Sequence, residues 1–371
     1  MGLEAGSASP EVTGFTTALY LFDVAQGIDV TALKTLVGGD VTTARLEDKS
    51  AGPSRVQYVV PPVVVDGRAL GVPQIDSFRV RVKFFDYGVI SLTLTRPFAC
   101  TWGALVADGQ ALIENEPLEE QAAAACRQIV QRVRAALTGV RETYLSEDYL
   151  VFAVTSCAGA ETAEQVMQSH GEEIAQLLRG ERLPLSADER SLVLRNRLSY
   201  LADDLVVSAW NAAFVFDNET SAGAAIEILE FANSQLLELR YHDEALEGEL
   251  TRLYAELQKG GRRGRFAGRR QTRAALSVQA LMIDVNELTD RMENAVKVVG
   301  DPYAARLFGL VADRLGLSRW KGSVEDKLKT LDDIRRFAVE QTNMAQANVL
   351  ELAILLILLL ELGLFFAGIM T

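Results

Sequence analysis

The sequence predicts an α+β protein. We expect an N-terminal mixed α/β domain with antiparallel hairpins, then a helical coiled-coil hairpin, then a C-terminal transmembrane helix. Three observations predict this fold class. Residues 77–96 alternate apolar and charged side chains, as a half-buried strand does. Residues 219–299 repeat apolar side chains at steps of three and four, as paired helices do. Residues 349–370 are almost entirely apolar.

The first predicted domain spans residues 15–217, after a Gly/Ser/Pro-rich start at 1–14 that we expect to be disordered. A hairpin is its clearest feature, because a strand up to Phe84 and another from Val89 flank a turn in which Gly88 is free to take a positive φ. The other predicted strands cover 17–24, 56–65 (an edge strand, because it holds two prolines), 149–155, 192–201 and 204–216, and the predicted helices cover 29–37, 119–137 and 161–179.

From residue 219 the pattern becomes helical. Two apolar seams, on either side of Gly260 and Gly261, predict an antiparallel helical hairpin within residues 218–322. Asp243 is the single polar interruption of the first seam. A third helix is expected up to Leu315, and Ser323 is expected to cap a last one. No breaker follows, so we expect a juxtamembrane helix over 323–348 that continues into the membrane. The first seam consists of Leu229, Ala232, Leu236, Leu239, Asp243, Leu246, Leu250, Leu253 and Leu257.

The apolar segment 349–370 predicts a transmembrane helix. A helix of this length rises about 33 Å, and the hydrocarbon core of a bilayer is roughly 30 Å thick. The alternative is a buried core helix. A carboxylate at mid-bilayer costs about 2.5–3.5 kcal/mol, so Glu361, together with Glu351, predicts a homo-oligomer with these residues at the helix interface. The start lacks a signal peptide, which predicts a single-pass tail anchor with the bulk on the cytosolic side, at the cytoplasmic membrane if the protein is bacterial.

A basic segment at 259–273 joins the two seams. Its seven positive charges leave the rest of a chain of net charge −13 at −20. Arginines on a glycine-rich loop suit phosphates, so the expected partners are a ribosome or other RNA, or anionic lipid; the alternative is a solvated loop. The residues expected to bind the anionic partner are Lys259, Arg262, Arg263, Arg265, Phe266, Arg269, Arg270 and Arg273.

Other function classes have little support in the sequence. The acidic net charge argues against general nucleic-acid binding, and no DNA partner is expected. Cys100, Cys126 and Cys157 lack metal-ligand spacing and read as reduced, buried residues. His242 and Glu238 are four residues apart, but two ligands do not make a metal site. No phosphate-binding, dinucleotide, zinc-protease or nucleophile-elbow motif is present, so we assign no catalytic, cofactor-binding or metal residue.

Three segments resemble the "required for meiotic nuclear division" family, as a divergent member. Residues 84–90 look like its FDYGVV hairpin, and residues 203–213 look like its second block, a D-x-L-A-x-S-type strand. Glu351, followed ten residues later by Glu361 in the apolar run, is similar to its C-terminal membrane segment. The resemblance implies a membrane-anchored, homo-oligomeric, non-enzymatic protein. A mitochondrial member supports organellar translation and is thought to tether ribosomes.

Three functional hypotheses follow. The leading one is a membrane-anchored oligomeric scaffold that presents the basic segment to a ribosome or another anionic partner. The second is a membrane-organising protein whose basic segment binds anionic lipid. The third is an enzyme or channel-like assembly that uses Glu361.

Overall fold

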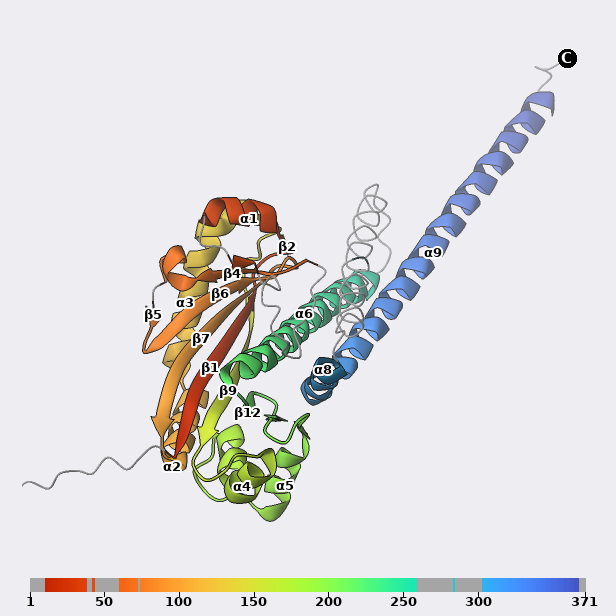
Figure 1. Cartoon of the computed structure of the whole chain (residues 1–371). Helices are drawn as coiled ribbons and strands as arrows, with labels where there is room; N and C mark the ends of the chain where they lie inside the picture. Colours follow the sequence, from red (N-terminus) through yellow and green to blue (C-terminus); the bar gives the residue numbers. More distant parts are fainter. Residues whose placement is uncertain are drawn as a thin grey trace, which may run out of the picture. The chain divides into compact units, whose positions relative to one another are not determined.

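The computed structural model of the chain describes residues 11–38, 42–43, 60–72, 74–258, 283 and 302–366. The chain divides into two compact units. One unit combines Met1–Tyr241 with Glu287–Lys321, and the other combines His242–Asn286 with Gly322–Thr371. This mixed α/β architecture agrees with the predicted class, with a large N-terminal sheet and helices toward the C-terminus (Figure 1).

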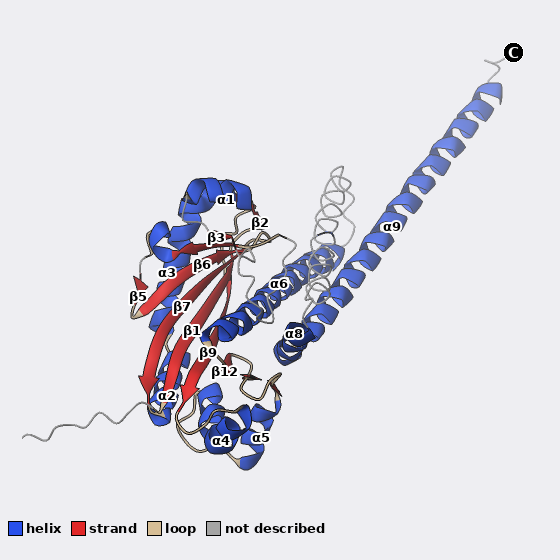
Figure 2. Cartoon of the chain, in the orientation of Figure 1, coloured by secondary structure: helices blue, strands red, loops and turns tan. Residues whose placement is uncertain are grey.

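The first unit is built on a ten-stranded sheet of order β10-β11-β12-β9-β1-β7-β6-β4-β3, with β5 paired to β6. Its long central strands appear side by side in Figure 2. All described pairings are antiparallel except β9 with β12, which is parallel. The strands are β1 (Val12–Asp23), β3 (Thr42–Thr43), β4 (Val63–Asp66), β5 (Gln74–Ile75), β6 (Phe78–Phe84), β7 (Val89–Cys100), β9 (Leu145–Cys157), β10 (Arg197–Leu198), β11 (Leu205–Ser208) and β12 (Ala212–Phe216). A separate small sheet pairs β2 (Gly27–Ile28) with β8 (Leu137–Thr138).

The predicted β6–β7 hairpin is confirmed. Its strands pair in register from Arg79 with Thr95 to Phe84 with Ile90. Gly88 has φ +99°, and a Cβ at this position would lie 1.9 Å from the carbonyl oxygen of Ala25. Only glycine fits this turn, for both its backbone conformation and the space available.

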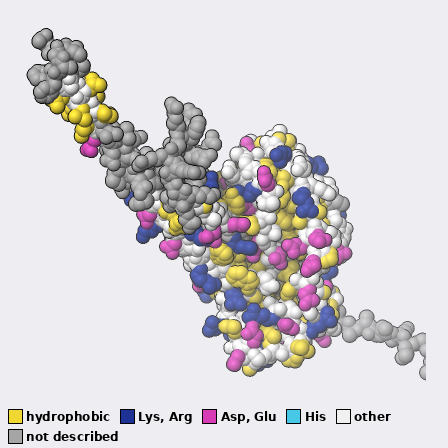
Figure 3. All heavy atoms as spheres, turned by 180° about the vertical axis from the view of Figure 1, so that it is seen from behind, with side chains coloured by type: hydrophobic (Ala, Val, Ile, Leu, Met, Phe, Trp, Pro, Cys, Tyr) yellow, Lys and Arg dark blue, Asp and Glu magenta, His cyan; other side chains and the backbone are white. Residues whose placement is uncertain are grey.

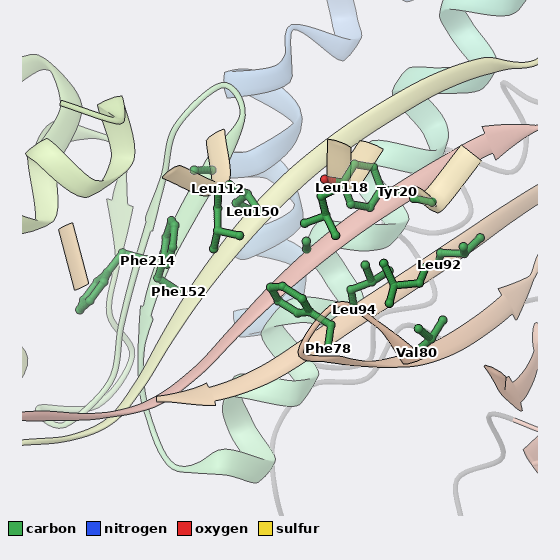
Figure 4. Packing of buried hydrophobic residues seen from close by; sticks show 14 of the residues in the cluster. Tyr20, Phe78, Val80, Leu92, Leu94, Leu112, Leu118, Leu150, Phe152 and Phe214 are labelled. Atoms are coloured by element: carbon green, nitrogen blue, oxygen red, sulfur yellow. The ribbon is translucent and has the colours of Figure 1, made fainter. Parts of the chain in front are cut away.

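One face of the sheet is apolar and is covered by helices. Alternate residues of the central strands point to this face, because strand side chains alternate with period two. They pack against α2 (Trp102–Ile113), α3 (Glu116–Val133) and α4 (Ala163–Arg179) in one hydrophobic core. Figure 4 shows Phe78 and Leu94 of the hairpin with Leu118 of α3, and Phe152 with Leu112 of α2. This core fixes the positions of the central strands.

Several predicted boundaries differ from the structure. β1 begins at Val12, so the prediction of disorder over 1–14 is wrong for residues 12–14. The predicted strand 192–201 is wrong: helix α5 (Ala187–Arg195), capped by Ser186, occupies its first half and only β10 remains. The predicted strand 204–216 is two strands, β11 and β12, with a turn between them. Helix α1 (Val30–Val37), capped by Asp29, confirms the helix predicted over 29–37.

Three helices follow the sheet: α6 (Glu219–Gln258), α8 (Pro302–Leu315) and α9 (Leu317–Phe366). The first seam is buried at most of its positions, including Leu236 and Leu246. Its polar interruption, Asp243, accepts a hydrogen bond from Ser323 (2.7 Å) and pairs with Lys327 (3.0 Å), both on α9. The second seam, 281–299, lies outside the described residues except for Ile283.

Helix α9 is continuous through residues 323–348, but it begins at Leu317, six residues before the predicted cap. The hydroxyl of Ser323 bonds Asp243 rather than capping a helix start. Within the described residues, no helix is both long enough and apolar enough to cross a bilayer, so the structure does not support the predicted transmembrane helix. The described side chains there are Glu351 and 353–363, whereas a span takes about 20 residues. The predicted span reaches Met370, beyond the described end of α9 at Phe366.

Candidate functional site

The residues predicted to bind an anionic partner lie outside the described part of the chain. This holds for the whole segment 259–273: Lys259, Arg262, Arg263, Arg265, Phe266, Arg269, Arg270 and Arg273. The two predicted oligomer contacts, Glu351 and Glu361, are both on α9 and both exposed.

The end of α9 is the most apolar exposed surface of the described chain. Seven consecutive large side chains, from Ile354 to Leu360, are 51–65% exposed. Successive residues of a helix turn by about 100°, so the run is apolar on every side. Figure 3 shows these hydrophobic atoms gathered on a short stretch bounded by grey. A core helix has apolar side chains on one stripe and buries them, which this segment does not do.

A second unusual region is polar and buried: the sheet face opposite the hydrophobic core, where the first part of α6 packs. Lys83 points to this face from β6, between the core residues Val82 and Phe84. Its ammonium group forms an ion pair with Glu230 of α6, and neither side chain is more than 8% exposed. Thr93 of β7 donates a second hydrogen bond to Glu230, at 3.3 Å. We call these contacts, with the ones described next, the buried polar interface.

The hairpin turn also belongs to the buried polar interface. The hydroxyls of Tyr87 and Ser234 lie 2.6 Å apart. Ser234 donates to the carbonyl oxygen of Phe231, at 2.7 Å, so the tyrosine is the donor of the shared bond. Gln235 donates to the tyrosine oxygen at 3.3 Å. The turn therefore holds the Tyr87 hydroxyl where it bonds one part of α6, at Ser234 and Gln235. The buried polar residues of α6 in this unit are Glu230, Asn233, Ser234, Gln235 and Glu238.

Ion pairs border the buried polar interface where β1 and β9 meet the loop after β8. Arg141 donates to Asp23 at 2.6 Å, and its guanidinium lies 3.4 Å from the ring centre of Tyr241 on α6. Burial raises the pKa of Asp23 to about 6, although Arg141 acts in the opposite direction. Burial likewise raises the pKa of Glu147, which pairs with Arg240 of α6.

The chemistry of the buried polar interface is structural. A lysine beside a carboxylate can exchange protons, but Lys83 and Glu230 are sealed between sheet and helix, and a substrate needs an open path to reacting groups. Taking two charges out of water is unfavourable unless they are well paired, so such a pair specifies one arrangement of partners more than it adds stability. The interface thus determines where α6 lies on the sheet.

A surface cavity of about 600 Å³ opens at the carboxyl ends of the parallel strands β9 and β12, a location where α/β proteins often bind ligands. Burial, with Asp204 and Asp203 nearby, raises the pKa of Asp217 at its edge to about 6. Burial also raises the pKa of the Cys157 thiol in its wall, so this cysteine is not an activated nucleophile. The lining residues are Thr155, Ser156, Cys157, Gly159, Ala160, Glu161, Gln165, Asp203, Phe216, Asp217 and Asn218.

Cysteine and metal chemistry can be stated for the described residues. Cys100, Cys126 and Cys157 are all free, and the last two are buried. Where the structure is described, no group of three or more His, Cys, Asp or Glu side chains is placed to hold a metal ion. His170 stacks on Trp102 with ring centres 4.5 Å apart, as a packing residue does.

The first unit is thus a mixed α/β domain in which apolar helices cover one sheet face, while α6 covers the other face and meets it through buried polar side chains. Residues 13–222 match the family model described as "Uncharacterized protein MJ0711, N-terminal domain". That match covers more than half of the chain, and the chain belongs to this family. The uncharacterized protein MJ0711 of Methanocaldococcus jannaschii is 24% identical over 189 residues, which are 51% of this chain and 57% of that protein. No solved structure matches the chain.

The family match bears on the N-terminal domain and leaves the other predictions open. The matched region ends at residue 222, so it includes only the start of α6 and no part of α8 or α9. The resemblance to the "required for meiotic nuclear division" family is not tested by these comparisons and stays a prediction.

Sequence reasoning missed the buried polar interface, although a signal for it was present. Glu230, Ser234 and Glu238 recur every four residues, so they form one polar stripe on a helix that is otherwise apolar there. Lys83 and Thr93 occupy alternate strand positions that normally face solvent. The polar stripe of α6 and the polar face of β6 and β7 are complementary, and sequence reasoning did not infer that they pack together.

Proposed function

We propose that this chain is a membrane-anchored, oligomeric, non-enzymatic scaffold that presents its basic segment 259–273 to an anionic partner. The observation that carries the proposal is the apolar run on α9, whose side chains remain more than half exposed from Ile354 to Leu360. Covering seven such side chains from water stabilises by on the order of 10 kcal/mol. So large an apolar surface needs a partner, either lipid or other helices.

Lipid is the partner we favour, because the run is apolar around the whole helix. A groove on another protein covers one side of a helix, whereas acyl chains cover all of it. The apolar sequence also continues beyond the described end of α9, through Met370. The soluble bulk would then lie on the cytosolic side, with the end of α9 as its attachment.

Oligomerisation is the second part of the proposal. Glu361 is an exposed carboxylate among leucines, and it makes no hydrogen bond or ion pair within the described residues. A carboxylate in an apolar medium needs a polar partner. Among the described helices only α9 has such an apolar run, so the partner we propose is the α9 helix of another copy. Glu351, ten residues earlier on the same helix, is the second expected contact.

The partner of the basic segment is a ribosome or another ribonucleoprotein in the leading version of the proposal. Arginines among glycines bind phosphate without a fixed sequence requirement. The alternative is a membrane-organising protein whose basic segment binds anionic lipid. Sedimentation with ribosomes at moderate salt supports the first version, and retention on vesicles only when they contain acidic lipid supports the second.

Membrane fractionation tests the proposal most directly. We expect the full chain to sediment with membranes and to resist extraction by high salt, and the Ile357→Arg variant to move to the supernatant. Leu36→Arg on α1, where the leucine is 47% exposed, is the matched control and should fractionate as wild type. Wild type found entirely in the supernatant would overturn the membrane attachment.

The mass of the detergent-solubilised protein tests the oligomer. Wild type should run as a multimer, and Glu361→Leu should change its mass while leaving it in the membrane fraction. A monomer for both proteins would contradict the helix contact. The quadruple variant Arg262→Glu, Arg263→Glu, Arg269→Glu, Arg270→Glu tests the basic segment, and partner binding that survives it rules that segment out.

A further inference from the structure

A second cationic surface lies within the folded domain, apart from the basic segment. Helix α5 and strand β10 form a surface cleft of about 380 Å³. We call it the arginine cleft. It is lined by Ala187, Arg190, Ser191, Leu194, Arg195 and Arg197.

The backbone explains why three arginines gather there. Arg190 and Arg195 are on α5, five residues apart, and the small residues Ala187 and Ser191 are on the same helix. Arg197 follows at once in β10, which pairs with Val207 of β11. Small side chains beside long ones leave a hollow, and the guanidinium groups border it. The cleft is thus a product of the helix-to-strand junction.

The charges in the cleft are only partly neutralised. Arg190 pairs with Glu172 at 2.8 Å. Arg197 makes one long hydrogen bond, 3.4 Å, to the carbonyl oxygen of Leu194. Within the described residues, Arg195 makes no hydrogen bond or ion pair. Asp188, at the start of α5, is exposed to solvent. Unpaired guanidinium groups in a chain of net charge −13 mark a place where an anion is favoured.

The strand that pairs with β10 leads to an exposed aromatic side chain. Asn196 and Ser208 exchange two hydrogen bonds of 3.0 Å, which hold the end of α5 beside the end of β11. Two residues further, in the turn to β12, Trp210 is 47% exposed. Exposed tryptophan and arginine are enriched in recognition surfaces relative to the rest of a protein.

We propose that the arginine cleft binds a phosphate group. Guanidinium presents paired N–H donors in a planar fork that matches the oxygens of phosphate, and Arg195 and Arg197 have donors to spare. The phosphate comes either from a soluble compound or from a lipid headgroup. This site goes beyond the proposed scaffold function, which uses neither α5 nor β10.

Titration of the full chain with inorganic phosphate, in a buffer free of other oxyanions, is the first test. We expect saturable binding by calorimetry, weakened at least tenfold in Arg195→Gln. Arg182→Gln removes the same charge from an exposed site outside the cleft, and it should bind as wild type. Ser191→Glu, which introduces a negative charge into the cleft, should also abolish binding.

Vesicles distinguish the two sources of phosphate. Retention on vesicles of phosphatidic acid and phosphatidylcholine, lost in Arg195→Gln but kept in Arg182→Gln, assigns the lipid headgroup. Binding of inorganic phosphate without that difference assigns a soluble compound. The proposal is overturned if wild type shows no saturable binding in either format, or if Arg182→Gln weakens binding as much as Arg195→Gln. RNA binding that is indifferent to Arg195→Gln, with no phosphate binding, overturns it as well.

Discussion

The two faces of the central sheet are built by different physics. On one face, Phe78, Phe152 and their neighbours pack against apolar helices. These hydrophobic contacts do not require a particular orientation of the side chains. On the other face, Lys83 and Tyr87 meet α6 through ion pairs and hydrogen bonds, which hold at one register only. The first face supplies stability, and the second specifies which helix position lies where. The comparison teaches that burial alone does not tell a stabilising face from a specifying one.

The largest effect should come from the apolar face. Phe152→Ala removes a fully buried ring and leaves a cavity, which should lower the free energy of unfolding by about 3–5 kcal/mol. Chemical denaturation followed by far-UV circular dichroism measures it. Leu183→Ala, at a side chain 74% exposed, is the control and should stay within about 0.5 kcal/mol of wild type. Equal losses in the two variants would contradict the placement of the core.

Breaking the buried ion pair should be nearly as damaging. Lys83→Met leaves Glu230 buried without its partner and should lower the free energy of unfolding by about 3 kcal/mol. The double variant Lys83→Met, Glu230→Leu should recover most of that loss, because no unpaired charge remains. A double variant whose loss equals the two single losses added together would show no coupling between the two side chains, and it would contradict the buried ion pair.

A neutral hydrogen bond on the same face should matter less. Tyr87→Phe deletes the hydroxyl that bonds Ser234 and should lower the free energy of unfolding by about 1–2 kcal/mol. The same substitution at Tyr254, which is 48% exposed, serves as the control and should change stability little. No loss in Tyr87→Phe would mean that the turn does not position α6.

The last prediction is a pH dependence from Asp23. Its folded pKa of about 6 lies above its ordinary 3.8, so the folded chain holds that proton more tightly. The resulting stability is present below about pH 4 and is lost as the pH rises to about 6, by up to about 3 kcal/mol. Asp23→Asn should flatten the decline in that window. Thermal melts between pH 4 and 7 measure it, and an unchanged slope would assign the decline to other carboxyl groups, such as Asp217.

The apolar face was the predictable part of the fold. The period-two pattern of residues 78–84 determined both the strand and its inward side chains, and Gly88 marked the turn. The 192–201 strand failed because a short helix with Leu192 and Leu194 on it alternates much as a strand does. Helix α2 went unpredicted, since its two glycines and short length give a weak helical signal.

The polar features were harder to predict, because their meaning depends on distant partners. Ser323 looks like a helix cap, yet its hydroxyl bonds Asp243, eighty residues earlier. Glu230 looks solvent-exposed until Lys83 is placed opposite it. The arginine cleft arises only where α5 meets β10, and the predicted strand there concealed it. The local sequence pattern indicates which side chains are buried, but it does not indicate which polar groups bond to each other in the fold.

Strand β1 imposes an order on how the protein can be made. It lies between β7 and β9 and pairs with both along its whole length, and both partners are synthesised after it. Its second neighbour ends at Cys157, which at 5–20 residues per second emerges roughly ten to thirty seconds later. Once β7 has emerged, β1 can pair along one edge, and its other edge has no partner strand until β9 closes the sheet. An unpaired edge of an apolar strand can pair with another chain, so the interval before β9 emerges is when this domain is most exposed to misassociation.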